Sequence, residues 1–144
     1  MTKILFGLAA VTAGAAAAFQ AAANAGLASR IGLGAALVVN TSIVLVGTLI
    51  LYVAAGRSGT FFPSDAPWSL YIGGLCGFVL LLSLAFVFPK IGAAVAIALV
   101  VLGQGAAALA IDHFGLLGMP TEPITLARVA GMLLVGAGLV LVRG

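Results

Sequence analysis

The sequence predicts an all-α integral membrane protein with five transmembrane helices. Of its 144 residues, 64% are hydrophobic and only 6% are charged, whereas about a quarter of the residues in a soluble domain are charged. Five long apolar runs cover residues 4–28, 33–55, 68–88, 91–111 and 124–142. Each is close to the roughly 20 residues that a helix needs to cross a hydrocarbon layer of about 30 Å. Because the intervening segments are short, we expect a single membrane domain over residues 1–144.

The first run imitates a secretory signal peptide, because Lys3 precedes it and the small-residue sequence Ala23-Asn24-Ala25 lies near its end. The apolar character continues over residues 4–28, which is longer than the ~7 to 15 residues of a signal-peptide core. Another apolar run follows directly. We therefore expect a retained transmembrane helix.

Prolines and aromatic residues lie near the ends of the later apolar runs. Trp68, at the start of the third run, is expected to anchor at the membrane surface. Pro89 and Lys90 are expected to form a tight turn between the third and fourth runs. Pro123 suits the first helical position of the fifth.

Basic residues in short loops orient membrane helices, because the side richer in Lys and Arg stays cytoplasmic. With five spans, Lys3, Arg57 and Arg128 fall on the N-terminal side, and Arg30, Lys90 and Arg143 fall on the opposite side. The numbers tie. Either another feature fixes a single orientation, or identical chains insert both ways and assemble as an antiparallel dimer.

A mechanistic consideration favours the antiparallel dimer. Many transporters consist of two inverted halves with the substrate site between them at the bilayer midplane. Five helices make one such half, which an inverted second copy would complete. The expected partners are therefore a second copy of the chain, the lipid bilayer and a small-molecule substrate. The basic residues are not clustered, so no nucleic acid is expected.

Four amide side chains are candidates for a substrate cavity: Gln20, Asn24, Asn40 and Gln104. An amide without a partner in hydrocarbon costs roughly 2 to 7 kcal/mol, so these side chains should face protein or water. Counting along the helices puts Gln20 about 12 Å and Asn40 about 10 to 11 Å from the same membrane side. In an inverted copy, Gln20 would approach the level of Gln104. The alternative is that the amides only hold helices together, with each hydrogen bond contributing about 0.6 kcal/mol.

Asp112 and His113 form the only adjacent titratable pair and end the fourth run. A coupling or gating role is one interpretation, since ionisable groups in a membrane pathway can carry protons. The other is that they lie at the wet interface and pair with Arg57 or Arg128.

Glycines are expected to mediate helix packing, because small residues let backbones approach closely in lipid. Gly73 and Gly77 form a GxxxG pair, and Gly131 lies four residues after an alanine. Gly103 and Gly105 flank Gln104 and leave its amide accessible to neighbouring backbone.

The chain lacks the residues that an enzyme site needs. One histidine, one cysteine within a span and three dispersed acids provide no metal cluster, catalytic triad or carboxylate pair. We therefore expect no enzymatic activity, no metal and no cofactor.

Several segments resemble the YdcZ-like family of small inner-membrane proteins: "FQAAANAGLASRIG", "PWSLYIGGLCGF", "FPKIGAA", "LGQGAAALAIDHFGLLG" and "LARVAGMLLVGAGLVLV". That family belongs to the drug/metabolite transporter superfamily, whose larger members have ten helices in two inverted five-helix repeats. The resemblance implies a multi-pass half-transporter of a bacterial inner membrane, and some relatives occur as dual-topology, paired or fused chains. Gln20, Asn24, Gln104, Asp112 and His113 match motif positions of the family.

The sequence thus predicts an exporter or facilitator that moves a small solute by alternating access as an antiparallel homodimer. Two alternatives stay open. A passive pore would share the same polar lining, and a non-transporting scaffold or assembly subunit would share the same helices. Substrate, coupling ion and direction of transport are not encoded in any motif found here.

Overall fold

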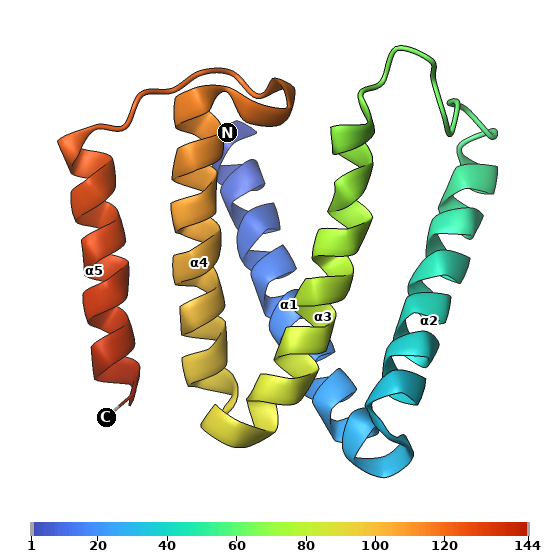
Figure 1. Ribbon diagram of the computed structural model, residues 1–144, viewed down its shortest axis with the longest axis horizontal. Coiled ribbons are helices and arrows are strands. Elements are labelled where there is room, and N and C mark those ends of the chain that lie inside the picture. The colour runs from blue at the N-terminus through green and yellow to red at the C-terminus, as the bar shows by residue number, and fades with distance from the viewer. Residues whose placement is uncertain (1, 144) are drawn as a thin grey trace. The chain divides into compact units, whose positions relative to one another are not determined.

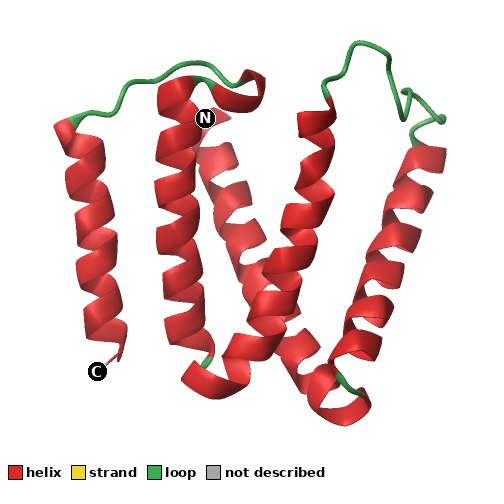
Figure 2. Ribbon diagram, viewed as in Figure 1, coloured by secondary structure: helices red, strands yellow, loops and turns green. Residues whose placement is uncertain are grey.

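The computed structural model describes residues 2–143, and the side chains of residues 4–142. Over this part of the chain it consists of five α-helices and two short 3-10 helices joined by loops (Figures 1 and 2). In chain order these are α1 (Thr2–Ile31), α2 (Leu33–Ala54), η1 (Trp68–Tyr71), α3 (Ile72–Ile91), α4 (Ala93–Phe114), η2 (Leu116–Gly118) and α5 (Leu126–Arg143). The all-α prediction is confirmed.

Four of the helical segments are long and apolar enough to cross a membrane: Ile4–Ile31, Leu33–Ala54, Trp68–Ile91 and Ala93–Phe114. The apolar part of α5, Leu126–Val142, is shorter. Large apolar side chains are widely exposed, including Phe19 at 79% and Leu134 at 74%. Such a surface would be unstable in water but matches lipid, so the chain is an integral membrane protein. The fifth span stays a prediction.

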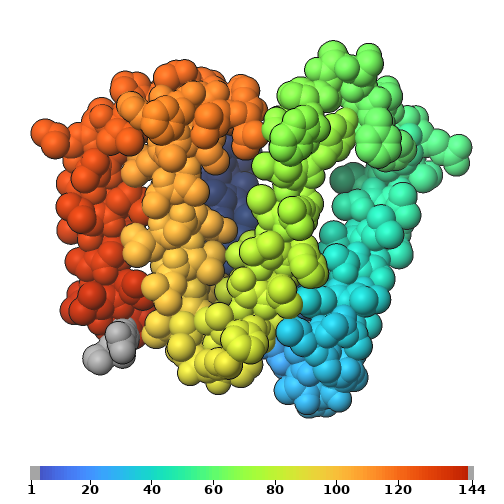
Figure 3. All heavy atoms as spheres, in the orientation of Figure 1, coloured from blue at the N-terminus to red at the C-terminus, as the bar shows by residue number. Residues whose placement is uncertain are grey.

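The helices fall into two compact units, one extending to Pro89 and the other beginning at Lys90. In the first unit, α1 and α2 are in contact, and Ala21, Ala25, Ala36 and Leu37 are buried. In the second unit, α4 and α5 pack side by side, and their atoms touch along their length (Figure 3). The prediction of one membrane domain over residues 1–144 stays a prediction.

Two one-residue glycine links join consecutive helices in almost the same conformation. Gly32 has φ 87° and ψ 151°, and Gly92 has φ 80° and ψ 157°. L-residues with a side chain rarely adopt this region, so glycine is required at both links. In each case the N–H of the alanine four residues later donates to the glycine carbonyl, at 3.1 Å for Ala36 and 3.2 Å for Ala96. This repeat was not found from the sequence.

The expected turn at Pro89 and Lys90 is wrong, because α3 continues through both residues to Ile91. Proline removes one helical hydrogen bond but does not by itself reverse the chain. Helix α3 ends just before Gly92, whose positive φ lies outside the helical region.

Helix α5 begins at Leu126 rather than at residue 124, and Pro123 lies before it. The start is fixed by Thr125, whose Oγ1 accepts a hydrogen bond from the Arg128 N–H at 3.3 Å. A hydroxyl that caps the third N–H in this way is a common helix start. The Thr125 cap, and not Pro123, therefore determines where α5 begins.

Candidate functional site

An amide pair joins α1 to α2 within the apolar part of both helices. The Gln20 side chain donates from Nε2 to Oδ1 of Asn40 at 3.4 Å, and both residues are partly buried. The two side chains therefore meet across the helix pair, and the membrane depth assigned to them stays a prediction. The bond is long for an N–H to oxygen contact, so it constrains the pair weakly.

A second amide lies one turn further along α1 and is more deeply enclosed. Asn24 is only 5% exposed, with buried Ala21 and Ala25 beside it on the same helix. Its Nδ2 has no hydrogen-bond partner among the described residues, and neither has Nδ2 of Asn40. A buried donor left without an acceptor costs about 1 to 3 kcal/mol. The α1–α2 pair therefore contains two buried amide donors, Nδ2 of Asn24 and Nδ2 of Asn40, without acceptors in the described part of the chain.

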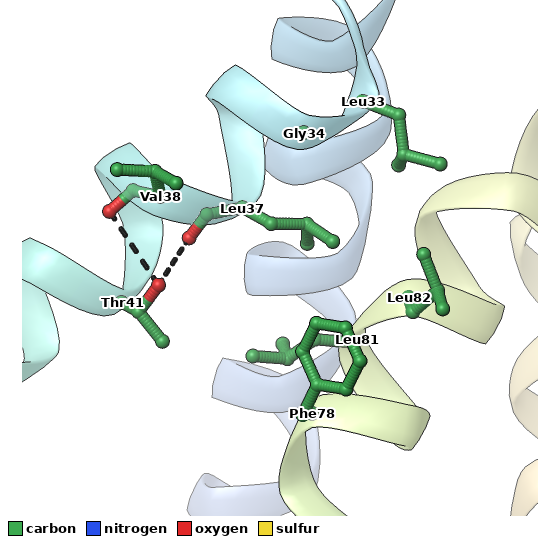
Figure 4. Close-up of a pocket in the computed structure, with 8 residues that line it drawn as sticks. All are labelled: Leu33, Gly34, Leu37, Val38, Thr41, Phe78, Leu81 and Leu82. Atoms are coloured by element: carbon green, nitrogen blue, oxygen red, sulfur yellow. Dashed lines mark hydrogen bonds between the residues drawn. The ribbon is translucent and has the colours of Figure 1, made fainter.

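An apolar groove of about 360 Å³ runs between α2 and α3 in the same unit (Figure 4). It is lined by Leu33, Gly34, Leu37, Val38, Thr41, Phe78, Leu81 and Leu82. The Thr41 hydroxyl donates to the backbone carbonyl of Leu37 in its own helix, so it offers little polarity to the groove. Sequence reasoning missed this groove, because apolar residues that face a groove and apolar residues that face lipid show the same pattern.

Gln104 lies exposed on α4. Its membership of a cavity with Gln20, Asn24 and Asn40 stays a prediction. Of the two glycines beside it, Gly103 has open space where a Cβ would lie. At Gly105 a Cβ would lie 2.7 Å from Sδ and Cε of Met132 on α5, so this glycine permits close packing of the two helices.

The other glycines expected to pack helices lie in open surroundings. At Gly73, Gly77 and Gly131 nothing lies within 4 Å of the position that a Cβ would take. Within the described chain, therefore, these three positions are free to meet lipid or another chain. Their packing role stays a prediction.

Asp112 and His113 hold the connection between α4 and α5. Of the two expected partners for this pair, the structure selects Arg128, whose Nη1 lies 3.4 Å from Oδ2 of Asp112. Arg128 Nη2 also lies 3.7 Å from Oε2 of Glu122. His113 accepts a hydrogen bond at Nδ1 from the Ile124 N–H at 3.3 Å. These side chains are partly or largely exposed, as expected at a membrane surface.

A metal centre is not part of this arrangement. Among the residues that the structure describes, no three His, Cys, Asp or Glu side chains lie close enough together to hold a metal ion. Cys76 is a free, exposed thiol on α3. The groups available for recognition are therefore amides, hydroxyls and apolar surface.

Long apolar helices with amide side chains placed among them define a helical membrane protein. Residues 5–141 match the family described as "Putative inner membrane exporter, YdcZ". This match covers nearly the whole sequence, so the chain belongs to the YdcZ family of membrane transporters, as its motifs predicted. Neither the curated proteins nor the solved structures compared with the chain include a match.

Proposed function

We propose that the chain is half of a small-solute exporter and that two copies, inserted in opposite orientations, form the working unit. Family membership supports export. The equal division of six basic residues supports two orientations. In this proposal α5 is the fifth span, because its 18 residues extend about 27 Å, close to the roughly 30 Å of the hydrocarbon layer.

The main support for a transport site is that the side-chain amides of Asn24 and Asn40 are not fully hydrogen-bonded. If these side chains served only to hold helices together, their donors should be satisfied within the helix pair. Both Nδ2 atoms instead lack an acceptor among the described residues. A changing partner, such as a solute that enters and leaves, accounts for such donors better than static packing does.

The second copy supplies Gln104 in this proposal. Counted from the ends of the apolar runs at residues 28 and 91, Gln20 is about 12 Å and Gln104 about 20 Å from the same membrane side. Inverting one copy moves its Gln20 to about 18 Å in a hydrocarbon core of about 30 Å. Gln20, Asn24 and Asn40 of one copy and Gln104 of the other would then line one central cavity. Asp112 and His113 would gate it at the membrane surface.

Export is tested by expressing the chain in a bacterium that lacks its major exporters and measuring survival across a panel of toxic compounds. We expect improved survival for a subset of compounds. Gln20→Ala and Gln104→Ala should abolish the benefit while cross-linked dimer persists. The matched control is Thr48→Val, because the Thr48 hydroxyl bonds only to carbonyls of its own helix, at 3.0 and 2.9 Å. Loss of the dimer in the glutamine variants would favour a purely structural role.

The two alternatives give different results. A passive pore would produce steady ionic current or unsaturable flux when the purified protein is placed in lipid bilayers. A scaffold subunit would leave survival unchanged and would copurify with a larger complex.

Orientation is tested with single cysteines in a Cys76→Ala background. Ser58, in the loop after α2, and Ser29, near the end of α1, are both exposed and should lie on opposite membrane sides. A membrane-impermeant maleimide added to intact cells should label about half of the Ser58→Cys chains and half of the Ser29→Cys chains. Full labelling of one variant with none of the other would contradict dual orientation.

A further inference from the structure

We propose that the solute held by Asn24 and Asn40 is an uncharged molecule with a hydrogen-bond acceptor, such as a carbonyl or phosphoryl oxygen, on a compact apolar body. This inference rests on the proposed transport function and specifies which chemistry the site selects. It follows from three features of the α1–α3 unit: the unsatisfied donors, the absence of charge along the spans, and the groove.

The unsatisfied atoms are both donors. Nδ2 of Asn24 and Nδ2 of Asn40 are buried amide nitrogens without partners in the described chain, and an amide nitrogen can donate but not accept. A group that completes them must therefore bring lone pairs. A cation without lone pairs would meet the positive end of two N–H dipoles and gain nothing from them.

The spans around these donors carry no charge. The sequence has no Lys, Arg, Asp or Glu over residues 4–29, 33–56 or 66–89. Arg30 is the nearest basic residue along α1, six positions from Asn24, or about 9 Å along the axis. An ion held at the amides would lose its hydration without gaining a counter-charge beside it, which is strongly unfavourable in a low-dielectric site. This disfavours cations and anions alike.

The groove between α2 and α3 fits the apolar body. Leu37 and Leu81 project toward each other from the two helices, with Phe78 beside them (Figure 4). Leu37 is three residues before Asn40, so the two share a face of α2. The groove lining does not include the amides, so in this proposal the apolar part of the solute lies against these side chains and its acceptor reaches the amides only when α1 and α2 separate.

In this conformation the donors are closed off. Each unpartnered nitrogen exposes less than 1 Å², and the Gln20 to Asn40 bond spans the two helices. The solute reaches the donors when α1 and α2 separate and the long Gln20 bond breaks.

Three probes with the same triphenyl body separate these requirements. Triphenylphosphine oxide is neutral and a strong acceptor. Triphenylphosphine sulfide has nearly the same shape but is a poor acceptor, and methyltriphenylphosphonium is a cation without an acceptor. Binding is measured on the purified full-length protein in nanodiscs, with empty nanodiscs subtracted to remove partitioning into lipid.

We expect the oxide to bind at least about tenfold more tightly than the sulfide or the phosphonium, the ratio that one charge-free hydrogen bond sets. Asn24→Leu should weaken oxide binding by about tenfold and leave sulfide binding unchanged. The control variant Thr48→Val, on the same helix as Asn40, should bind the oxide and the sulfide as tightly as the unchanged protein does.

Equal or tighter binding of the phosphonium would overturn the inference, as would equal binding of oxide and sulfide or a failure of all three to bind. If Asn24→Leu does not fold, the oxide-to-sulfide ratio of the unchanged protein decides alone. The survival assay and the labelling of Ser29→Cys and Ser58→Cys test the transport proposal separately. A chain that exports compounds but prefers the phosphonium would refute the solute class while leaving export intact.

Discussion

Arg128 Nη1 lies 3.4 Å from Oδ2 of Asp112, which ties the first turn of α5 to the last turn of α4. The same guanidinium donates to the Glu122 backbone carbonyl at 3.4 Å, so one side chain holds both the helix and the loop before it. Their side chains are 35% and 39% exposed, and exposed ion pairs contribute little because water screens them. The pair therefore fixes geometry more than it adds stability.

A double-mutant cycle with Asp112→Asn and Arg128→Gln should give a coupling energy of about 0.2 to 1 kcal/mol. Unfolding by SDS titration in mixed micelles measures each corner of the cycle. The coupling should shrink in high salt, because salt screens exposed charges. A coupling that survives high salt unchanged would mean that the pair is more deeply enclosed than described.

The His113 ring should protect the Ile124 N–H from hydrogen exchange, because Nδ1 accepts from it at 3.3 Å. His113→Ala should speed exchange at Ile124, while His113→Asn, whose Oδ1 can take the place of Nδ1, should preserve protection. Equal exchange in all three proteins would show that the contact is not kept in the membrane.

Gly105 should tolerate only small substitutions. A Cβ there would lie 2.7 Å from Met132 Sδ and Cε, and methionine is flexible enough to move aside for a methyl group. Gly105→Val should lower stability by about 1 to 3 kcal/mol through overpacking, and adding Met132→Ala should recover part of the loss. Gly103→Val, in open space, is the matched control, and SDS titration compares the three proteins. If Gly105→Val and Gly103→Val lowered stability equally, the cause would be helix propensity and not packing against Met132.

The glycine links should resist substitution for a conformational reason. Gly32→Ala and Gly92→Ala should each cost about 1 to 3 kcal/mol, because their backbone region is closed to side-chain-bearing residues. Gly34→Ala lies in the adjacent helix with open space around it and should be neutral or stabilising by up to about 1 kcal/mol. Thermal unfolding in one detergent compares the three, and a similar change at all three positions would contradict the argument.

The sequence was sufficient to predict those features that depend only on position along a regular helix. Counting residues from one membrane side put Gln20 and Asn40 at one level, and their hydrogen bond shows that the two side chains meet. Assigning Asp112 and Arg128 to the same side anticipated one of two pairings, and the structure selected it. Helix geometry is regular, so depth and side follow from counting.

Sequence reasoning failed where backbone conformation or tertiary contact decides. The helix break assigned to Pro89 lies at Gly92, because a positive φ ends the helix there and the proline does not. The start of α5 depends on the Thr125 hydroxyl, a local contact that the apolar pattern did not show. The groove depends on how α2 and α3 diverge, which no property of a single helix reveals.

The glycine link at Gly32 also has a consequence for membrane insertion. A single linking residue leaves no loop between α1 and α2, so we expect these two helices to enter a membrane together as one hairpin. Arg30, two residues before Gly32, would then lie near the tip of that hairpin, and one insertion event would set the orientation of both helices.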